Sequence, residues 1–214
     1  MIFIDKGREP RALTEYKLQE HAYYDGCPKS AIRESLTAEQ GNLCAYCMRR
    51  IDKDSARIEH WIPECLLTEY EKMDYRNLLG VCSGHLEGQQ GRDDTCDAHK
   101  KDTPITVSPL NESTLRGIYY CSANGEIHSS DETVNSDLND TLNLNSRQHR
   151  LPMNRKAKLE EVILLLKKRY GTKDWAIGKL RSFLDTYSRV NANGDKPEYL
   201  GIIEWYINKR INGR

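Results

Sequence analysis

The stretch Cys44-Ala45-Tyr46-Cys47 opens the part of the sequence that decides the fold. Two thiolates separated by two residues can hold one ion in a tight turn, and sulfur ligands favour zinc. Cys82 and Cys96 supply a second pair, with 13 residues between them instead of the roughly two to four that are usual. The pattern predicts a zinc site on Cys44, Cys47, Cys82 and Cys96, with His85 as the alternative to one of them.

A short motif of an acid and a histidine lies between the two cysteine pairs. It is Ile58-Glu59-His60-Trp61-Ile62-Pro63, and it is followed by Asn77 ahead of Cys82 and by Cys96-Asp97-Ala98-His99-Lys100. An acid beside a histidine means little alone, but this order of motifs around four cysteines is a much rarer coincidence. A structural zinc ribbon needs no such acids and histidine beside its metal, so the set points to catalysis.

On these motifs the sequence resembles the HNH endonucleases with a four-cysteine zinc support, whose core is the ββα-metal fold. More narrowly, the stretches 43–47, 58–63 and 96–100 resemble the PtuB proteins, the HNH effectors of Septu and of certain retron anti-phage systems. The ββα resemblance covers roughly residues 40 to 105. The sequence Leu142-Asn143-Leu144-Asn145 and the helical C-terminal half also look like that family.

The resemblance implies cleavage of a phosphodiester with one hard divalent cation, Mg²⁺ or Mn²⁺, and one histidine. His60 would be the general base, since an imidazole with a pKa of about 6.5 takes a proton near neutral pH. Glu59 would bind the cation, although the family usually has the shorter Asp there. Asp97 stands in the slot of the final HNH histidine and is assigned as the second cation ligand, with His99 as the alternative. Asn77 is expected to brace the loop that carries the base.

Composition limits the class of protein. The 214 residues include 32 Lys+Arg and 32 Asp+Glu, and a net charge of zero argues against a protein that coats nucleic acid through bulk electrostatics. The charge is nevertheless segregated, because residues 147–181 hold 11 basic and 3 acidic residues whereas residues 122–146 hold five acids and no Lys or Arg. The basic residues of 147–181 are interpreted either as a solvated helix face or as a surface that binds nucleic acid. Lys100 reads as a phosphate contact or a surface cation.

No apolar run approaches the roughly 18 to 20 residues that cross a bilayer, so no membrane association is expected. The N-terminus has no basic segment followed by a long apolar one, which argues against a signal peptide. Seven cysteines, an odd number, fit a disulfide framework poorly, and the expected location is the reducing cytoplasm. Cys27, Cys65 and Cys121 are expected to be ordinary buried or half-buried thiols.

The expected fold class is α+β and mainly helical. Residues 1–40 form an N-terminal helical segment, residues 41–105 the zinc-supported HNH (ββα-metal) module, and residues 106–214 a hairpin and a C-terminal helical bundle. A Thr-x-x-Gln capping box is expected at 37–40, and Asn124-Gly125 predicts the hairpin turn. Apolar spacing predicts helices over 13–24, 30–36, 153–170, 174–190 and 199–211. The insertion 83–95 is expected to face a substrate or partner.

The leading hypothesis is a metal-dependent HNH endonuclease that cleaves nucleic acid, DNA more than RNA, as the effector of an anti-phage defence complex. The resemblance implies a PtuA-like ABC-type ATPase as partner, and this chain has no Walker A sequence of its own. A retron RNA–DNA component is a further partner that the resemblance allows. The alternatives are a non-catalytic zinc module that binds nucleic acid or protein, and an HNH nuclease of restriction or mobile-element type.

Overall fold

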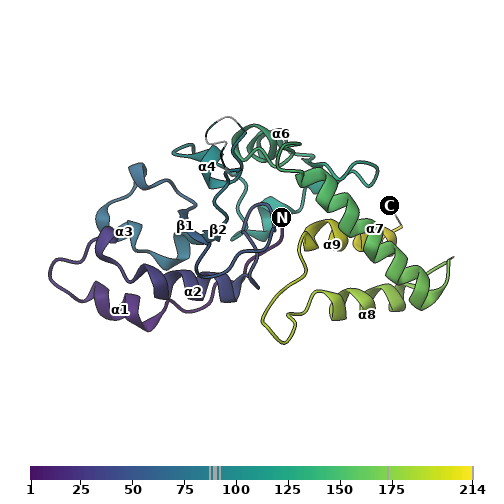
Figure 1. Cartoon of the computed structure of the whole chain (residues 1–214), viewed down its shortest axis with the longest axis horizontal. Helices are drawn as coiled ribbons and strands as arrows, with labels where there is room; N and C mark the ends of the chain where they lie inside the picture. Colours follow the sequence, from purple (N-terminus) through teal and green to yellow (C-terminus); the bar gives the residue numbers. More distant parts are fainter. Residues whose placement is uncertain (87, 89–90, 92, 173, 214) are drawn as a thin grey trace.

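The computed structural model describes residues 1–86, 88, 91, 93–172 and 174–213. These residues form a mainly helical α+β structure with two sheets of two strands each, which confirms the predicted fold class at that level. Figure 1 shows an elongated molecule, with α1, α2, α3 and the first sheet toward one end and α7, α8 and α9 toward the other. Residues 87, 89, 90 and 92 of the predicted surface insertion lie outside the described residues.

The regular elements are short helices, two antiparallel pairs of strands and three C-terminal helices. The α-helices are α1 (Arg11–Lys17), α2 (Lys29–Glu39), α3 (Glu69–Lys72), α4 (Asp97–Lys100), α5 (Glu112–Leu115), α6 (Glu132–Ser136), α7 (Leu151–Tyr170), α8 (Ile177–Tyr187) and α9 (Leu200–Ile211). The 3-10 turns are η1 (Tyr24–Gly26), η2 (Glu64–Leu66) and η3 (Tyr75–Asn77), and η4 (Asp137–Thr141) is a π-helix. None of the described helices combines the length and the apolar character that spanning a bilayer requires.

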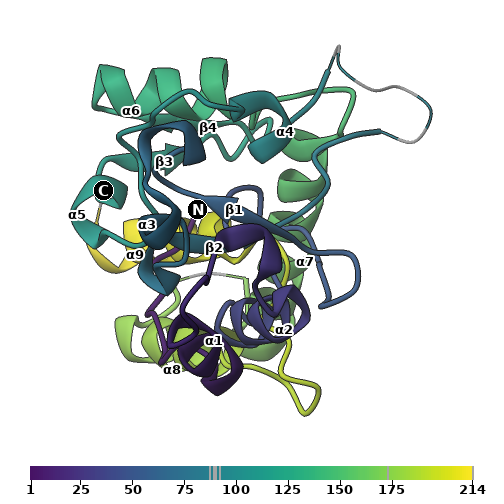
Figure 2. The same ribbon diagram turned by 90° about the vertical axis from the view of Figure 1, so that its left-hand side faces the viewer.

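The first sheet pairs β1 (Arg57–His60) with β2 (Leu78–Val81) in antiparallel register, so that Glu59 faces Leu79 across the ladder. Figures 1 and 2 show α2 on one side of this sheet and α4 on the other. The buried Gln40, which follows α2, exchanges two hydrogen bonds of 2.7 Å with the backbone of Gly80. The sheet is therefore fixed to the helix that precedes it in the chain.

The second sheet is the hairpin that Asn124-Gly125 predicted. It pairs β3 (Ile118–Tyr120) with β4 (Ile127–Ser129), with Tyr119 opposite His128. Gly125 has a φ of +79°, and a Cβ there would lie 2.0 Å from the carbonyl oxygen of Pro152, so the turn requires glycine. The guanidinium of Arg155, which is 1% exposed, donates to the carbonyl oxygens of Gly125 and Leu144 and joins the hairpin to α7.

Several expected helix boundaries are wrong. The helix predicted over 13–24 ends at Lys17, because the residues after it lie mostly exposed, Leu18 at 83%, and have no core to pack on. The helix predicted over 174–190 spans only α8. No capping box forms at 37–40, because Thr37 lies inside α2 and its hydroxyl donates to the carbonyls of Arg33 and Glu34 in the preceding turn.

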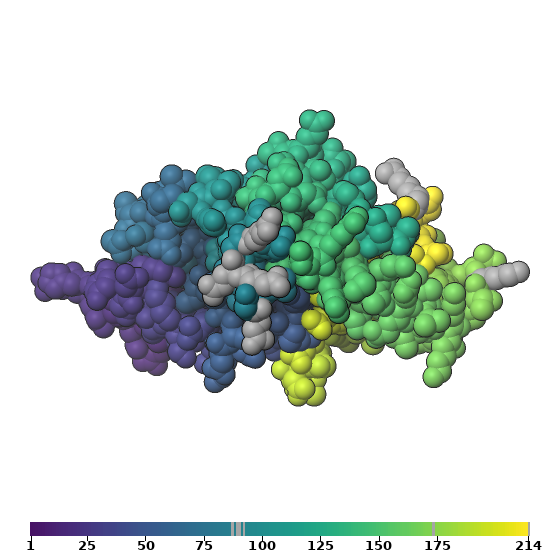
Figure 3. Space-filling model, turned by 45° about the horizontal axis from the view of Figure 1, so that its top comes forward, coloured from purple at the N-terminus to yellow at the C-terminus, as the bar shows by residue number. Residues whose placement is uncertain are grey.

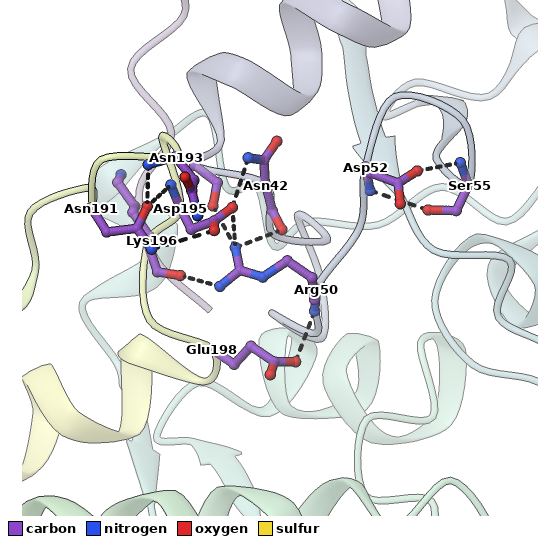
Figure 4. Close-up of polar contacts among 10 residues, drawn as sticks. Asn42, Arg50, Asp52, Ser55, Asn191, Asn193, Asp195, Lys196 and Glu198 are labelled. Atoms are coloured by element: carbon purple, nitrogen blue, oxygen red, sulfur yellow. Dashed lines mark hydrogen bonds and ion pairs between the residues drawn. The ribbon is translucent and has the colours of Figure 1, made fainter.

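A segment near the C-terminus packs against the cysteine turn (residues 42–50), and Figure 4 shows its contacts with Asn42 and Arg50 at the two ends of that turn. This strap, residues 195–199, is held mainly by Arg50, whose guanidinium donates to the Lys196 carbonyl (2.6 Å) and lies 3.3 Å from Asp195. Asn42 donates to the same Asp195 carboxylate at 2.8 Å, and Glu198 accepts from the Arg50 amide at 2.9 Å. In the space-filling view of Figure 3, the chain leading into α9 accordingly lies against the region of residues 40–55.

Candidate active site and metal centre

The four cysteines predicted to bind zinc come together. Their Sγ atoms all lie within 4.8 Å of one another, and three of the pairs are 3.8 or 3.9 Å apart. Four sulfurs at about 2.3 Å from a tetrahedral zinc ion lie about 3.8 Å from each other, whereas a disulfide requires about 2.05 Å. The donor set and its spacing therefore fit a zinc ion, and all four residues are free cysteines.

His85, the alternative zinc ligand, is turned toward other groups. Its Nδ1 lies 2.7 Å from the carboxylate of Asp94, and its Nε2 lies 3.5 Å from the guanidinium of Arg57. The metal-binding group found among the described residues contains the four cysteines and no histidine. Of the three other cysteines, Cys27 is buried and Cys121 half-buried as expected, but Cys65 is exposed. Cys65 lies in η2, a surface turn whose residues do not enter the core.

The sequence interpretation missed a cation that contacts the cysteine cluster. Arg49 donates from Nε to Cys47 Sγ and from Nη2 to Cys82 Sγ, both at 3.5 Å. Hydrogen bonds from the neighbouring thiols, together with the charge of Arg49, lower the pKa of Cys47. Four thiolates around one Zn²⁺ carry a net charge of −2, and the guanidinium offsets part of it. An arginine two residues after a C-x-x-C pair was the available signal.

Glu59, His60 and Asp97 line one hollow of about 280 Å³, with Ile58, Pro63, Glu64, Lys101 and Asp102 as the other lining residues. Glu59 and His60 end β1, and Asp97 opens α4 directly after the cysteine Cys96. Both side chains at the end of β1 are nearly buried. The hollow thus gathers two carboxyl groups and one imidazole from the predicted set.

The Glu59 carboxyl lies in an environment that disfavours its charge. Burial, and then the facing Asp97 carboxyl, raise the pKa of Glu59 to about 8, although Lys100 opposes this rise. Two carboxylates that face each other in a hollow repel unless a cation lies between them, and oxygen donors suit Mg²⁺ or Mn²⁺. The residues present therefore fit a hard divalent cation at Glu59 and Asp97.

Lys100 was expected to be a surface cation or a phosphate contact, and its position fits neither. It is 1% exposed, so it is not a surface cation and does not reach a phosphate in this position. Its ammonium instead lies 2.8 Å from Glu59 Oε1 and donates to the His60 carbonyl at 3.2 Å. His99, the alternative cation ligand, also lies elsewhere, with its Nδ1 2.9 Å from the Thr141 carbonyl oxygen.

The His60 ring is oriented by a hydrogen bond from Nε2 and by packing against Tyr24. Nε2 lies 2.8 Å from the Lys72 carbonyl oxygen, which can only accept, so Nε2 carries a proton and the neutral ring has its lone pair on Nδ1. Nδ1 faces the Glu64 carboxylate at 3.2 Å. Burial lowers the pKa of His60, which favours the neutral imidazole at pH 7. The ring edge packs against Tyr24 with ring centroids 4.6 Å apart.

Asn77 contacts the loop that follows His60. Its side-chain oxygen accepts from the Ile62 amide at 2.8 Å, and its side-chain nitrogen donates to the Ile62 carbonyl at 3.1 Å. The backbone carbonyl of Asn77 also accepts from Trp61 at 3.0 Å. These bonds join the loop after β1 to η3, and a catalytic contribution of Asn77 stays a prediction.

We expect binding of Mn²⁺ to release protons from the metal-free site. With a pKa of about 8, Glu59 is mostly protonated at pH 7, and the cation must displace that proton to bind the carboxylate. Release should therefore be close to one proton at pH 7 and fall toward zero above pH 8, while Mn²⁺ affinity rises and levels off. Calorimetric titrations in buffers of different ionisation enthalpy measure this number. Glu59→Gln should release none, and wild-type binding without proton release would contradict the expectation.

Comparison with known proteins adds one relative. No model of a known protein family matches the chain. The chain is 28% identical over 151 residues to a protein of Vibrio cholerae serotype O1 biovar El Tor named "Retron Vc95 putative HNH endonuclease", and the match covers 65% of this chain and 68% of that protein. The similarity supports the HNH family. It says nothing of closeness to PtuB.

Proposed function

We propose that this chain is a metal-dependent HNH endonuclease that cleaves phosphodiester bonds in nucleic acid, with DNA as the expected substrate. The observation that carries the proposal is the hollow in which Glu59, His60 and Asp97 meet, beside a four-cysteine cluster of zinc dimensions. The name of the Vibrio cholerae relative supports a nuclease and a retron context. A non-catalytic zinc module has no need of an imidazole and two facing carboxyl groups in one hollow.

In this mechanism, Glu59 and Asp97 would hold a Mg²⁺ or Mn²⁺ ion, and such an ion, when bound, would polarise the scissile phosphate and stabilise the leaving oxygen. His60 Nδ1 takes the proton from the attacking water, since Nε2 is committed to the Lys72 carbonyl. The Glu64 carboxylate, 3.2 Å from Nδ1 and about half exposed, offers that proton a route to solvent. Asn77 keeps the loop after His60 in place.

We further propose that the nuclease is the effector of an anti-phage complex, close to PtuB, with a PtuA-like ABC-type ATPase and a retron RNA–DNA component as partners. The zero net charge supports a partner, because a chain without net charge has little bulk attraction for nucleic acid. Reconstitution with an ATPase encoded beside it, followed by cleavage assays on DNA and RNA with Mg²⁺ or Mn²⁺, tests this function. If the zinc-loaded complex cuts neither DNA nor RNA, the result favours the alternative of a non-catalytic zinc module.

We expect Asp97→Asn to weaken Mn²⁺ binding by at least about tenfold and to slow cleavage at limiting Mn²⁺, because the neutral amide removes one of the two anionic donors. The measurement is cleavage rate against Mn²⁺ concentration in the reconstituted complex. Asp185→Asn is the control, since Asp185 forms an exposed ion pair with Arg189 on α8. Equal Mn²⁺ dependence in Asp97→Asn and wild type would remove Asp97 from the site.

A further inference from the structure

Two buried donors converge on a single oxygen of Glu59. The Tyr46 hydroxyl donates to Glu59 Oε1 at 3.0 Å, and the Lys100 ammonium lies 2.8 Å from the same Oε1. Both side chains are almost fully buried, Tyr46 at 0% and Lys100 at 1% exposed. Because a carboxylate oxygen that accepts from two fixed donors has little capacity left, Oε2 is the oxygen that remains for another partner.

We propose that Tyr46 and Lys100 are positioning residues that hold Oε1 of Glu59 and present Oε2 as a one-oxygen ligand to the divalent cation. This inference rests on the proposed function, since it concerns the same cation site. It names two residues that do not touch the cation or the substrate and that act through Glu59.

Both donors are placed by the zinc cysteines. Tyr46 lies between Cys44 and Cys47 in the cysteine turn, whose Ala45 amide is tied to the Gly80 carbonyl of β2 at 3.0 Å. Lys100 ends the single-turn helix α4, and its amide donates to the carbonyl of the ligand Cys96 at 2.9 Å. The zinc cluster therefore sets the position of both donors, and through them the position of the cation ligand.

The two donors also restrain the long side chain of Glu59. Glutamate has one more rotatable bond, and an unrestrained side chain would lose more entropy when it binds a cation. Because Tyr46 and Lys100 hold Oε1, the Glu59 side chain has lost that rotational freedom before a cation binds. A one-oxygen ligand suits Mg²⁺ and Mn²⁺, which are small and six-coordinate, better than Ca²⁺, which often takes both oxygens of a carboxylate.

The test measures Mn²⁺ binding by electron paramagnetic resonance on the zinc-loaded full chain, with zinc counted by mass spectrometry. Tyr46→Phe and Lys100→Met should each weaken Mn²⁺ binding by about 10- to 100-fold, the range found when groups behind a metal ligand are removed. Both should also lower the preference for Mn²⁺ over Ca²⁺ while zinc content stays at one per chain. Lys100→Arg should recover part of the affinity, because it restores a cationic donor.

The matched controls are Tyr199→Phe and Lys158→Met. Tyr199 is a buried tyrosine that accepts from Asn154, Lys158 pairs with Glu161 on α7, and neither side chain lines the hollow. They should bind Mn²⁺ within about twofold of wild type. Unchanged Mn²⁺ affinity in Tyr46→Phe, with zinc retained, overturns the inference even if Lys100→Met fails to fold. A wild-type chain that binds no Mn²⁺ overturns the cation site of the proposed function itself.

Discussion

His60→Ala is expected to lower the cleavage rate at saturating Mn²⁺ by about 10²- to 10⁴-fold, the usual contribution of a general base. The ring that accepts the proton is removed, whereas Glu59 and Asp97 remain to hold the cation. Mn²⁺ affinity and zinc content should therefore stay close to wild type. Single-turnover cleavage in the reconstituted complex measures the loss directly, without a contribution from product release.

His60 also fills space against Tyr24, so the alanine variant leaves a small cavity. His60→Asn keeps a polar side chain in that space and should lose the same activity with a smaller effect on thermal stability. His128→Ala serves as the control, because His128 is half-buried on β4, outside the hollow. If the His60→Ala variant cleaves at the wild-type rate in an active complex, His60 is not the general base.

Loss of zinc should unfold the part of the chain that the four cysteines hold together. Binding of structural zinc contributes about 10–16 kcal/mol in small zinc domains, more than most whole domains have as net stability. Cys96→Ser is expected to lose zinc and to lower the melting temperature by more than about 10 °C. Circular dichroism and zinc analysis follow the two changes together.

Cys65→Ser is the matched control for this prediction, since Cys65 is an exposed cysteine outside the cluster. It should keep one zinc ion and the wild-type melting temperature. A chelator should reproduce the effect of Cys96→Ser on the wild-type chain. Full retention of structure and of Mn²⁺ affinity after chelation would show that the four cysteines do not organise the module.

Glu59, His60 and Asp97 were singled out through the resemblance to the HNH endonucleases, on motifs whose residue types metal chemistry restricts. Thiolate pairs for zinc and carboxylate oxygens for a hard cation have few substitutes, and local order along the chain reveals them. The order Cys44, Glu59 and His60, Cys82, Cys96 and Asp97 carries that information even without a structure. The structure brings these residues into one sheet, one turn and one short helix.

Contacts between segments that are far apart in the sequence could not be predicted from the sequence. Lys100 was read as a surface cation or phosphate contact because its type is usually exposed, and only the packing of α4 on β1 turns it toward Glu59. Tyr46 carries no local sign of the carboxylate that it contacts, whereas the position of Arg49, two residues after Cys47, was a signal that the sequence interpretation did not use. Thr37 and Gln40 have the sequence pattern of a capping box, but no helix begins there. Helix α2 continues past Thr37 to Glu39, and Gln40 forms hydrogen bonds with Gly80 of the first sheet.

The strap has a consequence for biosynthesis. Arg50 and Asp195 are 145 residues apart, so at about 5–20 residues per second the ribosome delivers the strap roughly 7–30 s after the turn that it covers. During that interval the cysteine turn has emerged without the hydrogen bonds from 195–199 that hold it. A nascent chain therefore carries the four cysteines and the residues of the hollow before it can complete the fold that supports them, and a chain released before residue 195 never forms these contacts.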